Sequence, residues 1–360
     1  MNLDSPTARR YRAPGRVNLI GGQVDWHEGC VVTVAIDRGV EVVAEPRADG
    51  RVTARSSAVP GVVDLASDGS TDPATVEPDW GRTIAAAIRR LTERGTPVGG
   101  ADLVFSADLP VGAGLSSSAA LAVASLLALA DPERPAPAGT DLALAAARVE
   151  LAGRGVPCGV QDPMTVVHGR ADHALLIDCR TPTATPLLLP RRLAVLVVHS
   201  GVPRDLAATP FAAHRAESLA VADAIGVRAL RDATAEQVVD HPRGRHAVSE
   251  MARVRAFADA LGRDDTDALG PLMDASHASS RDDMGVSTPE LDALAAALRR
   301  HGALGARLTG AGFGGCVVAL VPTDRAAPIA EAACARYRAE TAREPQWWSV
   351  RAVDGAGPVG

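Results

Sequence analysis

One segment constrains this chain more than any other: the run LPVGAGLSSSAALAVASLLALA, which begins at Leu109. The small residues at 112–114 let the backbone approach a ligand closely, and three consecutive serines then open an apolar helix. Backbone N–H groups at a helix start favour an anion, as does the helix dipole. The pattern therefore predicts a phosphate cradle. Its expected members are Gly112, Gly114, Leu115, Ser116, Ser117, Ser118 and Ala119.

An ordinary loop capped by a serine is the simpler interpretation, since serine is a common helix N-cap. Three serines in a row after a glycine exceed what a cap requires. The segment also differs from two familiar nucleotide-binding patterns: no lysine follows the glycines, as in a Walker A loop, and no GxGxxG follows a strand.

Composition argues against several functional classes. The chain has 360 residues, of which 47% are apolar and 22% charged, as in globular proteins. Its net charge of −6 argues against nucleic-acid binding. The longest apolar stretch, AALAVASLLALA, is shorter than the ~20 residues of a membrane helix, so we expect no membrane association. No signal peptide is visible, and the five cysteines are an odd number without CxxC spacing, so we expect a cytoplasmic protein.

The order of hydrophobic patterns predicts an α+β fold in which antiparallel or mixed sheets are covered by helices. Strand-like runs dominate the start of the chain, and the second half is richer in helix. Three prolines in TPTATPLLLPRR favour a boundary near Pro190. We therefore expect one lobe over residues 1–190, a second over 191–353, and a disordered tail over 354–360.

Several motifs in the same order resemble a known kinase superfamily. PVGAGLSSSAA, together with APGRVNLIG near the start and LTGAGFGGCVVAL near the end, resembles the motifs of galactokinase, homoserine kinase and mevalonate kinase, known as the GHMP superfamily. CGVQDPM and HALLIDCR are similar to the galactokinase branch in particular. The resemblance implies a two-lobed fold with the active site between the lobes, and a kinase that uses ATP and Mg²⁺ to phosphorylate the anomeric hydroxyl of a monosaccharide.

The resemblance also implies roles for four residues. Asp162 matches the aspartate that deprotonates or orients the sugar hydroxyl, and both readings stay open. Arg16 matches the arginine beside it and the transferred phosphate. Glu150 and Ser118 match the Mg²⁺ ligands, and oxygen ligands are those that Mg²⁺ prefers. Taken singly, these residues could instead be a helix cap, an exposed ion pair or solvated polar groups.

The stretch GGQVDW departs from the galactokinase pattern around the sugar. Asp25 stands where the family has its sugar-binding aspartate, but Gly22, Gln23 and Trp26 replace a glutamate, a histidine and a tyrosine. A Gly-Gly-x-x-Asp loop also resembles that of arabinokinases. The expected sugar is therefore galactose or a related arabinose-like or modified sugar. The predicted substrate-binding residues are Gly22, Gln23, Asp25, Gly159, Phe211, which replaces a family tyrosine, and Gly312.

Two other functions remain open at this stage. A kinase of the same fold could act on a non-sugar alcohol, although the galactokinase-type middle motifs argue against it. A galactokinase-like body could also serve as a non-catalytic sugar sensor, although the serine loop and Asp162 are both present. We expect a monomer or a weak homo-oligomer, with ATP and the sugar as partners.

Overall fold

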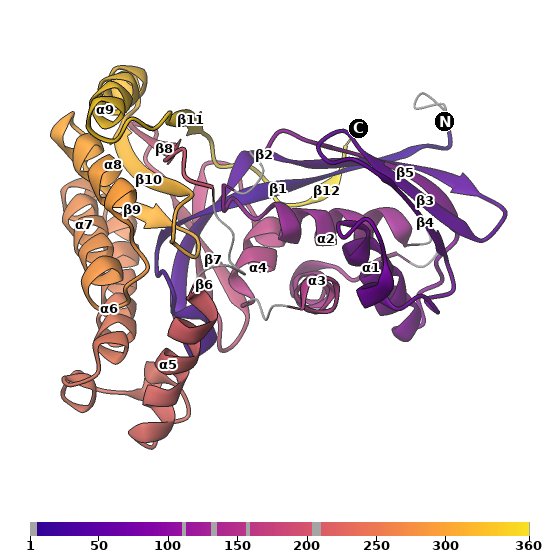
Figure 1. Cartoon of the computed structure of the whole chain (residues 1–360), viewed down its shortest axis with the longest axis horizontal. Helices are drawn as coiled ribbons and strands as arrows, with labels where there is room; N and C mark the ends of the chain where they lie inside the picture. The colour runs from indigo at the N-terminus through magenta and orange to yellow at the C-terminus, as the bar shows by residue number, and fades with distance from the viewer. Residues whose placement is uncertain (1–5, 110–112, 131–134, 156–158, 204–209, 360) are drawn as a thin grey trace.

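We describe the chain from a computed structural model, which covers residues 6–109, 113–130, 135–155, 159–203 and 210–359. Two sheets and their covering helices make up the molecule (Figure 1). The α+β class predicted from the sequence is confirmed. None of the helices within these ranges has the length and apolar character needed to cross a bilayer.

The first sheet has the order β12-β1-β2-β5-β3-β4, with β6 and β7 joined to it through β2. All its pairs are antiparallel except β3 with β5, so the sheet is mixed. Its strands are β1 (Arg9–Ile20), β2 (Cys30–Arg47), β3 (Arg51–Ser56), β4 (Val62–Ala66), β5 (Gly100–Ala107), β6 (His173–Asp178), β7 (Thr183–Leu188) and β12 (Gly357–Pro358).

Strand β2 is continuous over 18 residues. A β-carbon at Gly39 would lie 2.4 Å from the Ala13 carbonyl oxygen, so glycine allows β1 and β2 to approach closely at this point. The pairing also shifts register between Pro14 and Gly15. A β-bulge accommodates this irregularity, and β2 continues without a break.

Four helices lie on one face of the first sheet (Figure 1). Helix α2 contacts β1 and β2 as well as the other three helices, and after its exposed first residue it is buried or half-buried along its whole length. Its run of alanine, serine, valine and leucine suits this position, because a helix that is apolar all round belongs in a core. The four are α1 (Gly81–Glu93), α2 (Ser117–Leu129), α3 (Gly139–Arg154) and α4 (Gln161–His168).

The second sheet has the order β11-β8-β10-β9 and is antiparallel throughout. Its strands are β8 (Leu193–His199), β9 (Gly305–Thr309), β10 (Cys316–Pro322) and β11 (Gln346–Val350). The helices of this half are α5 (Phe211–Ala224), α6 (Pro242–Gly262), α7 (Thr266–Asp282), α8 (Pro289–Arg300) and α9 (Ala326–Thr341). The 3₁₀ turns are η1 (Asp25–His27), η2 (Pro73–Thr75), η4 (Leu230–Asp232), η5 (Glu236–Val238) and η6 (Thr323–Arg325).

Both faces of the second sheet are buried, so the two halves of the chain share a core. Along β8, Leu196 and Val198 pack with α8 and α9, whereas Val195 and Val197 join the main core that also contains the first sheet. Neighbouring residues of a strand point to opposite faces, which explains the alternation. The second sheet begins at Leu193, shortly after the boundary expected at Pro190.

The end of the chain is ordered, contrary to the disordered tail predicted for residues 354–360. Strand β12 pairs with β1, and the Gly355 N–H donates to the Gly169 carbonyl at 2.8 Å. The Val359 N–H donates to the Arg10 carbonyl at 3.0 Å. The tail is ordered because its backbone groups find partners that lie far away in the sequence. Residue 360 lies outside the described ranges.

Candidate active site

A cavity of about 730 Å³ runs between the helices of the first half and the loops of the second. Its walls come from the end of β1, the opening loop, the starts of α2 and α4, the end of α3, the start of α5 and the loop after β9. Predicted site residues that line it are Arg16, Gly22, Gln23, Asp25, Gly114, Leu115, Ser116, Ser117, Ser118, Glu150, Gly159, Asp162 and Phe211.

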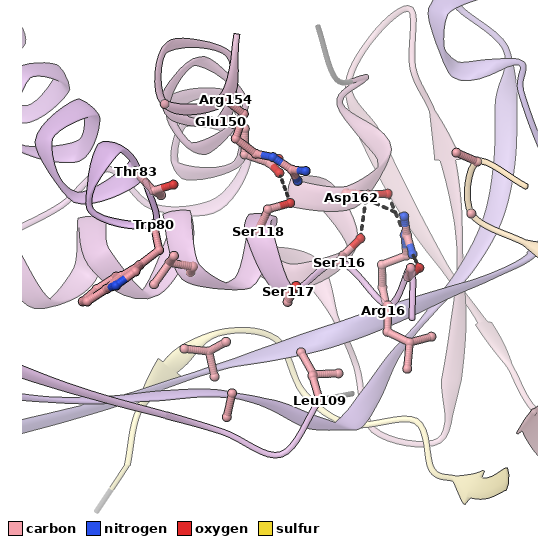
Figure 2. A pocket seen from close by; sticks show the side chains of 18 of the residues that line it. Arg16, Trp80, Thr83, Leu109, Ser116, Ser117, Ser118, Glu150, Arg154 and Asp162 are labelled. Atoms are coloured by element: carbon pink, nitrogen blue, oxygen red, sulfur yellow. Dashed lines mark hydrogen bonds and ion pairs between the residues drawn. The ribbon is translucent and has the colours of Figure 1, made fainter. Parts of the chain in front are cut away.

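Arg16 and Asp162 form a bidentate ion pair in this cavity (Figure 2). The Arg16 Nε donates to Asp162 Oδ1 at 2.6 Å, and its Nη2 donates to Oδ2. The Arg16 Nη1 also donates to the Gly114 carbonyl at 2.7 Å. A single, almost fully buried guanidinium thus holds a carboxylate from α4 against the glycine loop.

The serine loop is bound to the same carboxylate. Ser116 precedes α2 with a left-handed φ of 61°, and its hydroxyl donates to Asp162 Oδ2 instead of capping the helix. The Leu115 carbonyl accepts from the Arg16 N–H at 3.0 Å, and Ser117 is exposed at the helix start. Ala119 is buried beneath the loop. Gly112 lies outside the described residues.

Ser118 and Glu150 meet on the neighbouring helices α2 and α3 (Figure 2). The Ser118 hydroxyl donates to Glu150 Oε1 at 2.6 Å, whereas the buried Oε2 has no hydrogen-bond partner among the described residues. Burial, followed by the charge of Asp162, raises the pKa of Glu150 to about 7. An unpartnered carboxylate oxygen at this depth is a group that a cation would satisfy.

Asp25 lines the same cavity from the turn η1. A β-carbon at Gly159 would lie 1.6 Å from Asp25 Oδ2, so only glycine leaves room for this carboxylate. Burial, followed by the negative charge of Asp162, raises the pKa of Asp25 to about 6. The two carboxylates are therefore close enough to influence each other across the cavity.

The remaining predicted residues surround Asp25 or support the loop beside it. Gln23 donates from Nε2 to the Gly310 carbonyl at 3.1 Å and keeps a buried Oε1 without a partner among the described residues. The Phe211 ring packs edge-on against Trp26 at 5.8 Å between centroids. Gly312 is not among the residues that line the cavity. Its φ is +82°, and a β-carbon there would lie 2.2 Å from the Val286 carbonyl oxygen, so glycine allows this loop to pack against Val286.

Gly22 is held from beneath by a buried polar network. Its N–H donates to Glu250 Oε1 at 3.2 Å, and its carbonyl is 2.9 Å from His246 Nε2. A β-carbon at Gly22 would lie 2.4 Å from Arg307 Nη2. The guanidinium of Arg307 thus fills the space that a side chain at position 22 would take.

Comparison with known proteins identifies the family. A galactokinase from Roseiflexus sp. (strain RS-1) is 40% identical to this chain over 366 aligned positions, gaps included. The aligned region covers 97% of this chain and 92% of that protein. This chain belongs to the galactokinase family. Family models agree: the galactokinase galactose-binding signature matches residues 3–46, the GHMP kinases N terminal domain residues 82–170, and GHMP kinases C terminal residues 257–339.

Solved structures of related kinases share the fold of this galactokinase-family chain. Lactococcus lactis galactokinase, solved in complex with galactose, has a TM-score of 0.92 and 27% identity, over 99% of this chain and 96% of that one. The mevalonate kinase of Methanococcus jannaschii has a TM-score of 0.71 and 17% identity, over 98% and 99% of the two chains. The second likeness concerns the fold alone. The predicted GHMP architecture is thus confirmed.

The structure brings residues into the galactokinase-family site that the sequence did not single out. Trp80, Thr83 and Phe105 line the cavity beyond the serine loop, and Trp80 packs edge-on against Phe105 at 6.2 Å. Asn18 and Gln161 line the cavity as well. Gln161 directly precedes Asp162, and this adjacency is the one signal that could have marked it.

Proposed function

We propose that this chain transfers the γ-phosphoryl group of ATP to the anomeric hydroxyl of galactose, or of a closely related sugar. The observation that carries the proposal is the Arg16–Asp162–Ser116 cluster, which joins the serine loop to a carboxylate in the cavity that also holds Asp25. The 40% identity to a galactokinase and the likeness to a galactose-bound galactokinase support the choice of substrate.

In this proposal ATP occupies the serine-loop end of the cavity. The backbone N–H groups at the start of α2 receive phosphate oxygens, and the helix dipole adds to the attraction. The base lies between the apolar walls around Trp80 and Phe105, where an aromatic face suits a flat heterocycle. Arg154 lines the same stretch, on the helix that carries Glu150, and its positive charge favours the anionic ligand (Figure 2).

The sugar occupies the end lined by Asp25, Gln23 and Phe211. The carboxylate of Asp25 accepts hydrogen bonds from sugar hydroxyls, and charged acceptors make the stronger hydrogen bonds. Gly22 leaves this wall without a side chain, because Arg307 fills the space behind it. Because this wall then offers the sugar no side-chain hydrogen bond at position 22, a sugar with a different substituent from galactose stays within the proposal.

The transfer itself follows from these positions. The anomeric oxygen attacks the γ-phosphorus, the bond to the β–γ bridging oxygen breaks, and the hydroxyl proton passes to Asp162 or to water. Asp162 orients the hydroxyl because Arg16 and Ser116 fix both of its carboxylate oxygens. Arg16 also neutralises charge that develops on the phosphoryl group, and phosphoryl transfer depends mostly on such positioning and charge stabilisation.

Glu150 and Ser118 fit a Mg²⁺ ion, because Glu150 Oε2 is buried without a partner among the described residues and both side chains supply oxygen. Within the described ranges no three His, Cys, Asp or Glu side chains gather as a metal cluster. A Mg²⁺ held here would draw its other ligands from phosphate and water, and it would shield the phosphate charge.

We also propose that a single chain suffices for activity and that it works in the cytoplasm. Every residue in the mechanism comes from one chain, so assembly beyond a monomer is not required. The four cysteines within the described ranges are free thiols, which suits a reducing compartment.

A coupled assay of ADP release tests the proposal. Galactose, L-arabinose, fucose, galactosamine, glucose and heptoses are compared with mevalonate and homoserine as acceptors, and NMR of the product identifies the phosphorylated carbon. We expect a sugar 1-phosphate, with galactose or a close relative preferred. Turnover of only the non-sugar alcohols would overturn the proposal, and so would binding of ATP and sugar without any turnover.

A further inference from the structure

A chain of three hydrogen-bonded side chains connects the buried core to the sugar end of the cavity. It starts at Arg307 on β9, which is fully buried. The Arg307 Nη1 donates to Asn18 Oδ1 at 2.9 Å and to the Asn18 carbonyl at 3.2 Å. A guanidinium has only donors, so the atom of Asn18 that faces it must be the carbonyl oxygen of the amide.

The orientation of Asn18 determines that of Gln161. With its oxygen turned to Arg307, Asn18 presents Nδ2, which donates to Gln161 Oε1 at 3.0 Å. If the Gln161 amide were turned over, two NH₂ groups would face each other, and the hydrogen bond would be lost. The backbone of Gln161 is held as well, because its carbonyl accepts from Thr165 Oγ1 at 2.7 Å.

The Gln161 Nε2 is therefore a donor that faces the cavity. Gln161 is only partly buried and lines the cavity beside Asp162, and its Nε2 has no hydrogen-bond partner within the described ranges. The same cavity is lined by two acceptors, the carboxylate of Asp25 and the unpartnered Oε1 of Gln23. A sugar hydroxyl that donates to such an acceptor still has lone pairs that need a donor.

We infer that Gln161 is a specificity-determining residue, whose amide Nε2 donates a hydrogen bond to a hydroxyl oxygen of the sugar. Asn18 and Arg307 are positioning residues that keep this donor, and not the amide oxygen, turned to the substrate. The inference rests on the proposed function, because it assumes that the sugar occupies this end of the cavity.

The first test replaces Gln161 by methionine, which keeps the length of the side chain and removes the amide. We expect Gln161→Met to lower kcat/KM for the sugar by about three- to ten-fold, mainly through KM, with the KM of ATP unchanged. Gln346→Met, an exposed substitution on β11, is the matched control and should change neither constant.

A series of monodeoxy sugars identifies the partner oxygen. In the wild type, removal of each contacted hydroxyl should lower kcat/KM. In Gln161→Met, the sugar that lacks the partner of Gln161 should lose nothing further relative to the parent sugar, because the contact is already absent. Equal losses for every deoxy sugar in both proteins would contradict a contact between Gln161 and a hydroxyl.

The second test changes the orientation of the Gln161 amide and leaves the Gln161 side chain itself intact. In Asn18→Asp the new carboxylate still accepts from Arg307 but cannot donate, so Gln161 must turn its Nε2 inward and present Oε1 to the cavity. We expect Asn18→Asp to raise the sugar KM as much as Gln161→Met does. Combined with Gln161→Met, it should add no further increase in KM.

The outcomes separate the inference from the proposed function. If the wild type phosphorylates none of the sugars, the proposed function is wrong. If the wild type phosphorylates a sugar and Gln161→Met keeps the same kcat/KM, the inference alone is wrong. Effects of Asn18→Asp and Gln161→Met on the sugar KM that simply add would show that Asn18 does not act through Gln161 and would overturn its positioning role. Melting temperatures identify any variant that fails to fold.

Discussion

At the scale of single residues, Asp162 is the most constrained group in the site. Its two carboxylate oxygens are held by Arg16, and Ser116 adds a third hydrogen bond. A carboxylate fixed by three donors cannot turn away from its substrate. This rigidity suits a group whose task is to orient a hydroxyl or accept its proton.

Asp162→Asn should lower kcat by roughly 10²–10⁴-fold, the usual contribution of a positioned acid–base group. The amide cannot accept a proton, and one of its two atoms becomes a donor that faces the donors of Arg16. ATP binding, measured by calorimetry, should persist. Retention of most of the turnover would remove Asp162 from the mechanism.

Asp25 should make sugar binding dependent on pH. Its pKa is raised to about 6, so the carboxylate gains a proton as the pH falls through that value. A protonated Asp25 loses charge-assisted acceptance of sugar hydroxyls. We therefore expect kcat/KM for the sugar to fall below pH 6, and Asp25→Asn should lower the plateau and abolish this limb of the profile.

The raised pKa of Asp25 also makes the stability of the fold depend on pH, in the opposite direction from sugar binding. The ordinary pKa of 3.8 rises to about 6 on folding, so the folded chain holds a proton over this interval that the unfolded chain has released. Ionising Asp25 therefore reduces the free energy of unfolding as the pH rises from about 4 to 6. Asp25→Asn should raise the melting temperature at pH 7 more than at pH 4; an equal rise at both would refute the assignment.

Gly22 should tolerate no side chain without a loss of stability. The β-carbon of an alanine would meet Arg307 Nη2, whose guanidinium is held by Asn18. Overpacking of this kind typically costs about 1–3 kcal/mol, so Gly22→Ala should lower the free energy of unfolding in urea by that amount. Gly99→Ala, at an exposed position with no atom near its β-carbon, should have almost no effect.

At the scale of elements, the contact between α2 and α3 joins the serine loop to the predicted metal site. Ser118 lies in the first turn of α2, and Glu150 lies near the end of α3. Their hydrogen bond at 2.6 Å exists only because the two helices pack side by side on the sheet. The proposed magnesium site would thus depend on the packing of this helix pair.

Glu150→Gln should raise the Mg²⁺ concentration needed for half-maximal activity and lower kcat, because a neutral amide is a weaker ligand. Sugar affinity measured without nucleotide should change little. Activity is titrated with Mg²⁺ after treatment with EDTA in the wild type and in Glu150→Gln. Glu331→Gln, at an exposed position on α9, is the control. An unchanged Mg²⁺ requirement would leave Glu150 with a purely structural role.

At the scale of the whole molecule, the two halves are joined by a common core and by the returning end of the chain. The main core includes side chains from both sheets, and β12 brings the last residues back to β1 (Figure 1). The Ala356 N–H also donates to the Val166 carbonyl in α4, the helix that begins with Gln161 and Asp162. The tail therefore supports the element that carries the proposed chemistry.

Truncation after Val353 should destabilise the protein. It removes the backbone hydrogen bonds that Gly355, Ala356 and Val359 donate to the first half of the chain. At about 0.5–1.5 kcal/mol for each bond, the free energy of unfolding should fall by about 1.5–4.5 kcal/mol. Denaturation in urea measures the loss, and an unchanged midpoint would mean that the tail contributes nothing to stability.

Sequence alone was sufficient wherever a feature depends on neighbours along the chain. The glycines and serines before α2 form their loop, and the apolar run behind them forms a helix, because backbone conformation and periodicity are local properties. The motif order also identified the family and its expected residues. Arg16, Ser118, Glu150 and Asp162, named on that basis, lie in one cavity, while their roles stay predictions.

Only the tertiary structure decided the features that join distant segments. The oxygen of Asn18 faces Arg307 across 289 residues, and this contact sets the direction of the Gln161 amide. The glycine-rich tail is ordered because β1 supplies its partners, and Gly22 is bare because Arg307 fills the space behind it. No local pattern encodes such pairings, since they depend on which strands and helices become neighbours when the core closes.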